Sequence, residues 1–176
     1  MAVRTASLSD EEQIRELHLA AFGAEERDLV ASFAVDLLRE TATPKILHLV
    51  AEKDGCLVGH IAFSPIRARS DGNVIAYILA PLAVAPSFQK TGVGSKLVRE
   101  GLDWLSAQNI RVVLVYGDPD FYGRFGFGVE LAESFVPPFK LKYPFGWQAL
   151  SLAEQKAHVS SESFECVDSL SKAELW

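Results

Sequence analysis

Two glycines stand in a polar segment that follows an apolar run and opens a helical pattern. The segment reads Gln89-Lys90-Thr91-Gly92-Val93-Gly94-Ser95 and comes shortly after Leu82-Ala83-Val84. Because glycine has no side chain, successive backbone N–H groups can converge on one anion there. The start of the following helix adds its dipole and its unbonded amides. The segment predicts a phosphate or pyrophosphate site, although the same glycines could instead serve close packing where the helix starts.

Two common phosphate-binding motifs do not match this segment. A P-loop needs G-x-x-x-x-G-K-[ST], a spacing that neither Gly92 nor Gly94 begins. A dinucleotide-binding fingerprint follows its strand directly and needs a third glycine where this chain has Leu97. Asp118, after the next apolar run, could serve as a ribose-binding acid, so a dinucleotide oxidoreductase stays open as an alternative.

The composition limits the class of protein. The chain has 176 residues, with 17 Lys and Arg against 23 Asp and Glu, a formal net charge of −6 and 49% hydrophobic residues. This apolar content, with 11 Phe, 4 Tyr and 3 Trp, excludes intrinsic disorder. Two cysteines, Cys56 and Cys166, exclude a disulfide scaffold and a four-cysteine zinc site. The acidic balance disfavours nucleic acid as a partner, and we expect a cytoplasmic protein with no membrane partner and no bound metal.

Changes in hydrophobic period divide the chain into strands and helices that must position the glycine segment. Ser9 and Glu12 form a candidate capping box at the first helix. Asp54-Gly55 is typical of a two-residue hairpin turn. Predicted strands cover 3–6, 46–51, 57–63, 74–84, 111–116, a run from Phe127, and 147–152, and predicted helices begin at Ser9, carry Leu29 to Leu37, and cover 92–109 and 120–125.

This order of elements predicts an α/β protein of the α+β three-layer kind. We expect a single mixed, mostly antiparallel sheet with helices on both faces. Residues 1–152 are assigned to one domain, and residues 153–176 are expected to form a C-terminal tail packed on it.

His48 and His60 lie on the two strands that the Asp54-Gly55 turn joins. With a two-residue turn, residues whose numbers sum to 109 face each other, so His60 opposes Leu49 and His48 opposes Ile61. Opposed residues share a face of the sheet and successive residues alternate. The two imidazoles are therefore predicted on opposite faces, which disfavours a metal site made by this pair.

The glycine segment matches the pattern Gln-x-x-Gly-x-Gly, and with other features it resembles a known family. Over residues 3 to 127 the chain resembles the general N-acetyltransferase (GNAT) superfamily, whose members use acetyl-CoA. The likeness is greatest to bacterial predicted N-acetyltransferases of unknown substrate. It rests on Arg4-Thr5-Ala6, the acidic start of the first helix, Asp54-Gly55, the Gln89–Gly94 segment, and a Tyr-x-x-x-Gly-Phe signature from Tyr122 to Phe127.

The resemblance implies an acyl-CoA N-acyltransferase fold whose sheet splays apart at the cofactor. Pro81 suits such a place, because proline donates no hydrogen bond to a neighbouring strand. Asp118 stands where relatives often have asparagine, and it could contact the pantetheine or cap the next helix. By resemblance, the pantetheine arm is bound by the backbone of Leu82, Ala83 and Val84, the pyrophosphate is wrapped by the amides of Lys90, Thr91, Gly92, Val93, Gly94 and Ser95, and Gln89 and Asp118 complete the cofactor site.

The resemblance also implies direct attack of a primary amine on the acetyl thioester, with Tyr122 as general acid for the leaving thiolate. The acceptor would be a small-molecule amine or an exposed amine of a protein, and the chain could form a homodimer. Relatives often carry a glutamate on the strand before the glycine loop, and residues 74–84 contain no carboxylate. Candidates for the base are His60, Tyr77, Asp118 and a water chain. The missing carboxylate leaves a non-catalytic acyl-CoA-binding or sensor domain as the alternative.

Overall fold

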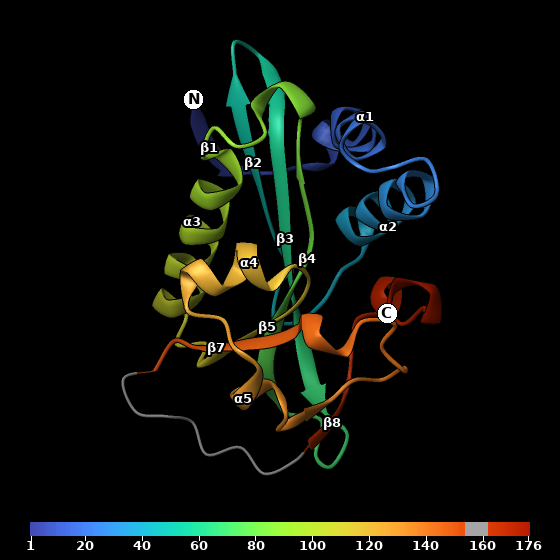
Figure 1. The fold of residues 1–176 in the computed structure, drawn as a ribbon, viewed down its shortest axis with the longest axis vertical. Coiled ribbons are helices and arrows are strands. Elements are labelled where there is room, and N and C mark those ends of the chain that lie inside the picture. The colour runs from blue at the N-terminus through green and yellow to red at the C-terminus, as the bar shows by residue number, and fades with distance from the viewer. Residues whose placement is uncertain (154–161) are drawn as a thin grey trace. The chain divides into compact units, whose positions relative to one another are not determined.

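The computed structural model describes residues 1–153 and 162–176. These residues form two compact units, one made of 1–63 and 80–101 and the other of 64–79 and 102–176. Figure 1 shows the chain, in which β3 (Cys56–Ala68), β4 (Val74–Val84) and α3 (Val93–Ala107) each continue from one unit into the other.

The first unit is a sheet edge with two helices packed on it. Helices α1 and α2 lie side by side (Figure 1). Ile14 of α1, Ala34 of α2, Val50 of β2 and Leu57 of β3 form one buried apolar cluster, so the two helices cover this part of the sheet. The elements that belong wholly to this unit are β1 (Ala2–Thr5), α1 (Glu11–Ala21), α2 (Arg27–Arg39) and β2 (Leu47–Lys53).

A 3-10 turn, Leu8–Asp10, precedes α1, and the capping box lies at this turn, two residues upstream of the predicted one. Ser7, not Ser9, precedes the first helical turn, and its backbone N–H donates to Asp10 Oδ2 at 2.8 Å. Arg4 of β1 donates to both oxygens of Asp10, at 2.9 and 2.8 Å. Asp10 can bind both groups because it is buried and lies three residues after Ser7, whereas the carboxylate of Glu12 lies two positions further along.

The hairpin between β2 and β3 contains a bulge that the sequence analysis missed. Asp54 and Gly55 both have positive φ, 52° and 80°, as the predicted two-residue turn requires. Next to the turn, partners sum to 109, as in the pair Lys53 and Cys56. Beyond the irregularity at Ala51 and Glu52 they sum to 110, so His60 faces Val50 rather than Leu49. The bulge adds one residue to β3 and reverses the face of every residue after it.

The second unit extends the sheet with β5 and β7. β4 pairs in parallel with β5 through Tyr77, Ile78 and Leu79, and β5 pairs antiparallel with β7. The strand predicted from Phe127 is wrong: Gly128 makes only an isolated bridge to Ala149, and a short helix follows. The elements that belong wholly to this unit are β5 (Val112–Tyr116), α4 (Pro119–Tyr122), α5 (Val129–Ala132), β6 (Phe135–Val136), β7 (Trp147–Ser151) and β8 (Glu162–Glu165).

Aromatic side chains from distant parts of the sequence gather in the second unit. Trp147 of β7 stacks on Phe164 of β8 with ring centroids 6.1 Å apart, and the C-terminal Trp176 lies 5.8 Å from Trp147. The Trp176 indole donates to the Leu170 carbonyl at 3.0 Å. These contacts hold the last residues of the chain against β7 and β8.

The sheet as a whole is mixed, and its strand order is β1-β2-β3-β4-β5-β7, with β8 pairing with β3 and with β6. The pairs β1–β2, β2–β3, β3–β8 and β5–β7 are antiparallel, and β4–β5 and β6–β8 are parallel. The predicted fold class, a mixed open sheet with helices, is confirmed. Within residues 1–153 and 162–176, no helix combines the length and apolar character needed to cross a membrane.

Strand β3 and helix α3 approach each other closely in the first unit. A Cβ at Gly59 would lie 2.8 Å from side-chain atoms of Val93 and of Leu97, and a Cβ at Gly101 would overlap the buried ring of Phe63. Each element thus has a glycine where the other has a large side chain. The helix that follows the glycine segment is therefore seated directly on the strand.

We expect Gly101→Ala to lower the free energy of unfolding by about 1–3 kcal/mol, because the added methyl group must displace the Phe63 ring from a packed core. Gly23→Ala is the matched control, since a Cβ there meets nothing within 4 Å. Urea denaturation of both variants measures the difference, and equal midpoints for the two would contradict this packing.

Candidate functional site

The glycine segment leaves the end of β4 through a short 3-10 turn, Pro86–Phe88, and is held by its own side chains. The Gln89 side-chain amide donates to the Val84 carbonyl at 3.2 Å. The Thr91 hydroxyl donates to the Phe88 carbonyl at 2.6 Å. Both bonds join a side chain of the loop to a carbonyl three or five residues before it, so the polar side chains of the motif stabilise the conformation of its backbone.

The backbone of this loop is arranged to present amides to an anion. Lys90 and Gly92 have positive φ, 61° and 94°, which is the kind of alternation that turns successive N–H groups toward one point. Lys96 makes the first backbone bond back to the loop, to the Gly92 carbonyl at 2.9 Å. The amides of Val93, Gly94 and Ser95 precede that bond, so they belong to the unbonded first turn of a 15-residue helix. This donor set fits a pyrophosphate.

The strand end before the loop is placed by β3 in the same unit. The Ala85 N–H donates to the Val58 carbonyl at 3.0 Å. Continued along these antiparallel strands, that pairing sets Ala83 across from His60. Ala83 is buried, whereas Leu82 and Val84 are half-buried, so this stretch of β4 is partly open on one side.

Tyr122 lies in the second unit, at the end of α4. Its ring packs edge-on against Phe121 and Phe127, with centroids 4.9 and 5.8 Å away, and Tyr122 is 9% exposed. Burial, and then the nearby Asp118 carboxylate, raise the pKa of Tyr122 above its ordinary value, so the phenol keeps its proton at neutral pH. Gly117 makes room for this ring, because a Cβ there would lie 2.5 Å from Tyr122 Cε2.

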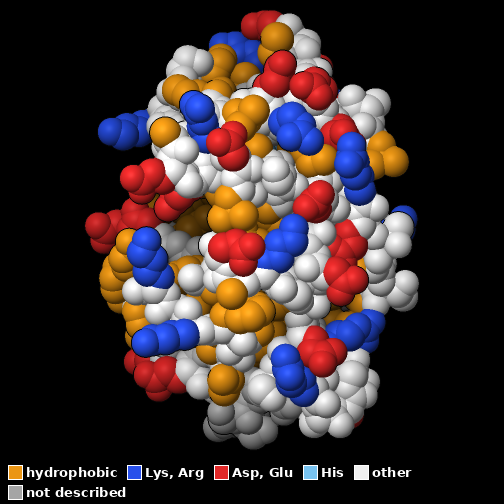
Figure 2. All heavy atoms as spheres, turned by 90° about the vertical axis from the view of Figure 1, so that its right-hand side faces the viewer, with side chains coloured by type: hydrophobic (Ala, Val, Ile, Leu, Met, Phe, Trp, Pro, Cys, Tyr) orange, Lys and Arg blue, Asp and Glu red, His pale blue; other side chains and the backbone are white. Residues whose placement is uncertain are grey.

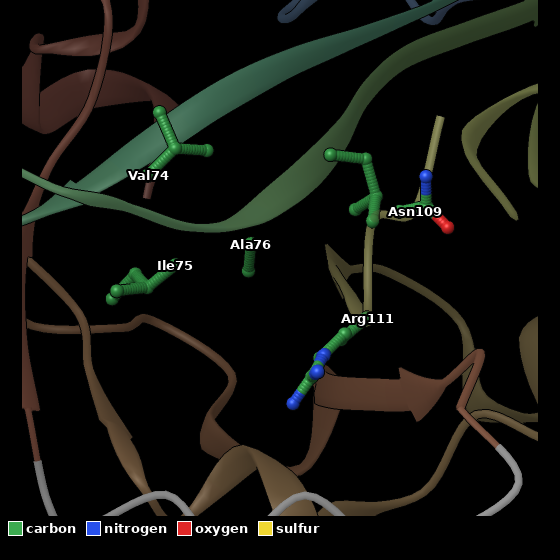
Figure 3. Close-up of a pocket in the computed structure, with 6 residues that line it drawn as sticks. Val74, Ile75, Ala76, Asn109 and Arg111 are labelled. Atoms are coloured by element: carbon green, nitrogen blue, oxygen red, sulfur yellow. The ribbon is translucent and has the colours of Figure 1, made fainter. Parts of the chain in front are cut away.

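Asp118 and Tyr77, two of the candidate bases, each have surroundings that give the residue a structural role. The exposed Asp118 caps α4, its side chain accepting the Asp120 N–H at 2.9 Å. Tyr77 is 1% exposed, and burial raises the pKa of its phenol. A hollow of about 210 Å³ lies between the first residues of β4 and the segment before β5. Ile75, Ala76 and Arg111 are among the residues that line it (Figure 3). No residue of the predicted site lines it.

The first unit contains a row of three buried histidines, and the prediction that His48 and His60 lie on opposite faces is wrong. His60 of β3 faces His18 of α1, with Nδ1 2.9 Å from His18 Nε2. On its other side, His60 Nε2 lies 3.2 Å from His48 Nδ1. The bulge at Ala51 and Glu52 causes this difference, because it moves His60 to the face that carries His48.

His18 was missed by the sequence analysis. It follows Ile14 and Leu17 on the buried face of α1, and this placement of a polar residue among apolar positions was the available signal. His18 and His60 are fully buried, and His48 is 8% exposed. Both ring nitrogens of His60 face other imidazoles, so His60 does not present a free nitrogen to an acceptor amine in this conformation.

Burial keeps all three rings neutral. Desolvation lowers the pKa of His18 to about 3 and that of His48 to about 4, the latter partly opposed by the Leu37 carbonyl. The pKa of His60 is lowered well below 6.5 by burial and by its two neighbours. The row is not arranged to bind a cation: among the described residues, no group of three or more His, Cys, Asp or Glu could hold a metal ion.

With this geometry in place, comparison with known proteins identifies the family. Residues 11–127 match the family model described as the acetyltransferase (GNAT) family. The chain belongs to the GNAT family. The matched range contains both the glycine loop and the Tyr122 signature, so the resemblance found in the sequence is confirmed. The "uncharacterized N-acetyltransferase YjhQ" of Escherichia coli K12 is 36% identical over 167 residues, which cover 91% of this chain and 88% of YjhQ.

Solved structures of GNAT proteins share the fold. The YhbS N-acetyltransferase of Escherichia coli, crystallised in complex with CoA, matches with a TM-score of 0.82 at 27% identity, covering 97% of this chain and 92% of YhbS. A GNAT acetyltransferase from Brucella melitensis in complex with acetyl-CoA matches with a TM-score of 0.66 at 29% identity, covering 94% of each chain.

The histidine row should make this GNAT protein sensitive to acid. The native rings stay neutral while those of the unfolded chain take up protons below about pH 6.5, so stability is present above that pH and is lost as the pH falls. Each histidine contributes a loss of about 1.4 kcal/mol per pH unit. We expect the free energy of unfolding to fall steeply between about pH 6.5 and about pH 5.

Urea denaturation at several pH values in that range measures the slope of the free energy of unfolding against pH. Native Asp10 does not titrate in this range, because Arg4 lowers its pKa to about 2. In His60→Leu the number of protons taken up on unfolding, which sets this slope, should decrease by about one, because one of the three rings is gone. An unchanged slope in this variant would contradict the neutral buried state of His60.

Proposed function

We propose that this GNAT protein is an acetyl-CoA-dependent N-acetyltransferase that acetylates a primary amine. The observation that carries the proposal is the glycine loop, in which Lys90 and Gly92 turn the backbone so that its amides meet the unbonded first turn of α3. The relatives support it: YjhQ is named as an N-acetyltransferase, and the YhbS and Brucella structures hold CoA and acetyl-CoA.

The cofactor would be held by backbone rather than by charged side chains. The amides of Lys90, Gly92, Val93, Gly94 and Ser95 would surround the pyrophosphate, whereas the Thr91 N–H, expected from the sequence to join them, donates to the Phe88 carbonyl at 3.4 Å. The half-buried strand end at Leu82, Ala83 and Val84 would hydrogen-bond the pantetheine arm as a neighbouring strand would. Gln89 acts indirectly, since its bond to the Val84 carbonyl fixes the angle at which the loop leaves the strand. Asp118 would act through α4, which it caps one turn before Tyr122.

Acetyl-CoA supplies an acetyl thioester, whose carbonyl carbon is the electrophile. In the proposed reaction the amine attacks that carbon directly, and sulfur leaves with the electron pair of the broken bond. Tyr122 is the proposed general acid for sulfur: the raised pKa keeps the phenol protonated at rest, so that it can donate a hydrogen bond to sulfur as negative charge develops there. Because a thiol is a stronger acid than this phenol, the phenol acts by stabilising the leaving thiolate while the carbon–sulfur bond breaks. The packing of Tyr122 between Phe121 and Phe127 would hold the phenol in one orientation.

The surface charge does not single out an acceptor. Figure 2 shows acidic and basic side chains interspersed over the face it presents, with apolar side chains between them. The net charge of −6 mildly favours cationic amines by long-range attraction. A small cationic amine and an exposed protein amine are therefore both included in the test.

The test combines binding and turnover. Calorimetry with acetyl-CoA, NAD and NADP should give binding of acetyl-CoA alone, and free thiol should then appear with one member of a panel containing diamines, arylalkylamines, aminoglycosides and peptides with a free amine. If acetyl-CoA does not bind at millimolar concentration, the proposal fails. Binding without thiol release over the panel would instead indicate the non-catalytic acyl-CoA-binding domain.

We expect Gly92→Ala to raise the Kd for acetyl-CoA at least about tenfold, because an alanine resists the left-handed backbone that aims the loop amides. Gly72→Ala is a matched control: its φ is +73° and a Cβ would meet nothing within 4 Å, but it lies in the turn between β3 and β4. Calorimetry on both variants measures the effect. Equal weakening in the two would mean that general strain, and not the loop, decides affinity.

We expect Tyr122→Phe to lower kcat by about 100-fold or more while the Kd for acetyl-CoA changes less than about twofold, because the variant loses only the proton donor. Tyr143→Phe is the control, since it also removes one hydroxyl group, which on this half-exposed tyrosine has no part in the proposed reaction. Steady-state thiol release measures both variants. Full turnover by Tyr122→Phe would remove the general-acid role and leave the fold assignment intact.

A further inference from the structure

Two exposed aromatic rings lie side by side just before β7, in the second unit. Tyr143 and Phe145 flank a proline, and their ring centroids are 5.9 Å apart with 52° between the ring planes. Tyr143 is 50% exposed and Phe145 is 65% exposed. Single apolar side chains on a surface are ordinary, but two large rings in contact form an apolar surface that a ligand can cover with a gain in stability. We call Tyr143 and Phe145 the aromatic pair.

The backbone that carries the aromatic pair is tied to the end of β5. The Tyr143 N–H donates to the Tyr116 hydroxyl at 2.7 Å, and the Gly117 N–H donates to the Gly146 carbonyl at 2.9 Å. The buried Gln148 amide donates to the Gly117 and Gly146 carbonyls, at 3.2 and 3.3 Å. The rings therefore stand on a hydrogen-bonded base, so a ligand that covers them would lose little free energy in ordering the segment.

Gly117 brings this base to Tyr122, the proposed general acid. A Cβ at Gly117 would lie 2.5 Å from Tyr122 Cε2 and 3.6 Å from Cζ, the carbon that carries the hydroxyl group. A Cβ at Gly146, the residue after Phe145, would lie 2.9 Å from the Gly117 carbonyl oxygen. Because neither glycine has a side chain, Tyr122 and the segment of the aromatic pair both contact the backbone of Gly117. The aromatic pair is thus next to the phenol assigned to the reaction.

Charge decides which kind of group suits the aromatic pair. The Lys142 ammonium lies 5.3 Å from the centroid of the Tyr143 ring. One cation already occupies the negative face of this ring, so a second ammonium group there would be repelled by it. A neutral aromatic ring meets no such repulsion, and it gains both ring–ring contact and buried apolar area. The aromatic pair therefore favours a neutral aryl group over the distal ammonium of a diamine.

From this geometry we infer that the acceptor is an arylalkylamine, whose ring packs on Phe145 while its primary amine reacts beside Tyr122. The inference rests on the proposed acetyl transfer and names the substrate class of that reaction. Phe145 is the specificity-determining residue. The Tyr143 ring lies against Phe145, and its hydroxyl group has no part in the contact, so Tyr143→Phe keeps both rings.

The first test compares three primary amines on the unaltered chain: 2-phenylethylamine, butylamine and 1,4-diaminobutane. Thiol release is measured at one pH, and each kcat/KM is expressed per unprotonated amine, because the three differ in basicity. The value for 2-phenylethylamine should exceed that for butylamine at least about tenfold, since an added apolar contact is realised only with the aryl group. Equal values, or the highest value for the diamine, would overturn the inference.

The second test removes the ring. Phe145→Ser should raise the KM for 2-phenylethylamine about tenfold with kcat nearly unchanged, because the contact is made equally in the bound amine and in the transition state. The kcat/KM for butylamine and the Kd for acetyl-CoA should change less than about twofold, which a general structural defect would not produce. An unchanged KM for 2-phenylethylamine, or an equal loss with both amines, would overturn the inference.

Three variants separate the aryl contact from other effects. Phe145→Trp and Tyr143→Phe keep the aromatic surface and should keep the preference for 2-phenylethylamine. Val129→Ser removes a different exposed apolar side chain, on α5, and is the matched control for Phe145→Ser. Loss of the preference in Val129→Ser to the same extent would show that surface polarity in general, and not the ring of Phe145, decides it, and would overturn the inference.

A second copy of the chain is the other occupant that the aromatic pair could take. Sedimentation equilibrium should give the same mass for the unaltered chain and for Phe145→Ser. A dimer that Phe145→Ser converts to a monomer would assign the pair to a contact between copies and overturn the inference. If the unaltered chain binds no acetyl-CoA, or releases no thiol with any amine, the proposed function and this inference fail together, whereas the outcomes above count against the aryl acceptor alone.

Discussion

The close approach of helix α3 to strand β3 is the constraint on which the rest of the first unit depends. Gly59 on the strand admits Val93 and Leu97 of the helix, and Gly101 on the helix admits Phe63 of the strand. Val93, Leu97 and Gly101 recur every four positions on the helix, and Gly59 and Phe63 are four apart on the strand, so one face of each element carries the contact. The contact fixes the helix start, and with it the amides that follow Gly92, against the sheet.

The same strand divides the chemistry of the unit between two faces. Gly59 faces α3, and its neighbour His60 points the opposite way, to His18 of α1. The side of β3 that carries α3 thus holds the start of that helix with its unbonded backbone amides, whereas the other side holds titratable side chains. The bulge in the β2–β3 hairpin decides this division, because without it the histidines of the two strands would face apart.

Local patterns in the sequence predicted the elements well where they depend on neighbouring residues. Asp54-Gly55 takes the positive φ values that its turn requires, and strand 74–84 and the helix after Gly92 lie where the apolar period placed them. The prediction was wrong where a distant contact intervened. Asp10 rather than Glu12 bonds the helix start because Arg4 from β1 holds it, and Phe127 begins no strand because only Gly128 reaches β7.

The sequence by itself determined the family, the fold class and the residues of the glycine loop, because these follow from short-range spacing that the backbone must obey. Tertiary structure alone decided which histidines meet. His60 lies 42 residues after His18 and 12 after His48, and the contact of the three depends on a single extra residue in β3 and on the packing of α1 over it. A bulge of one residue leaves almost no mark on composition or period, but it changes the face of every side chain beyond it.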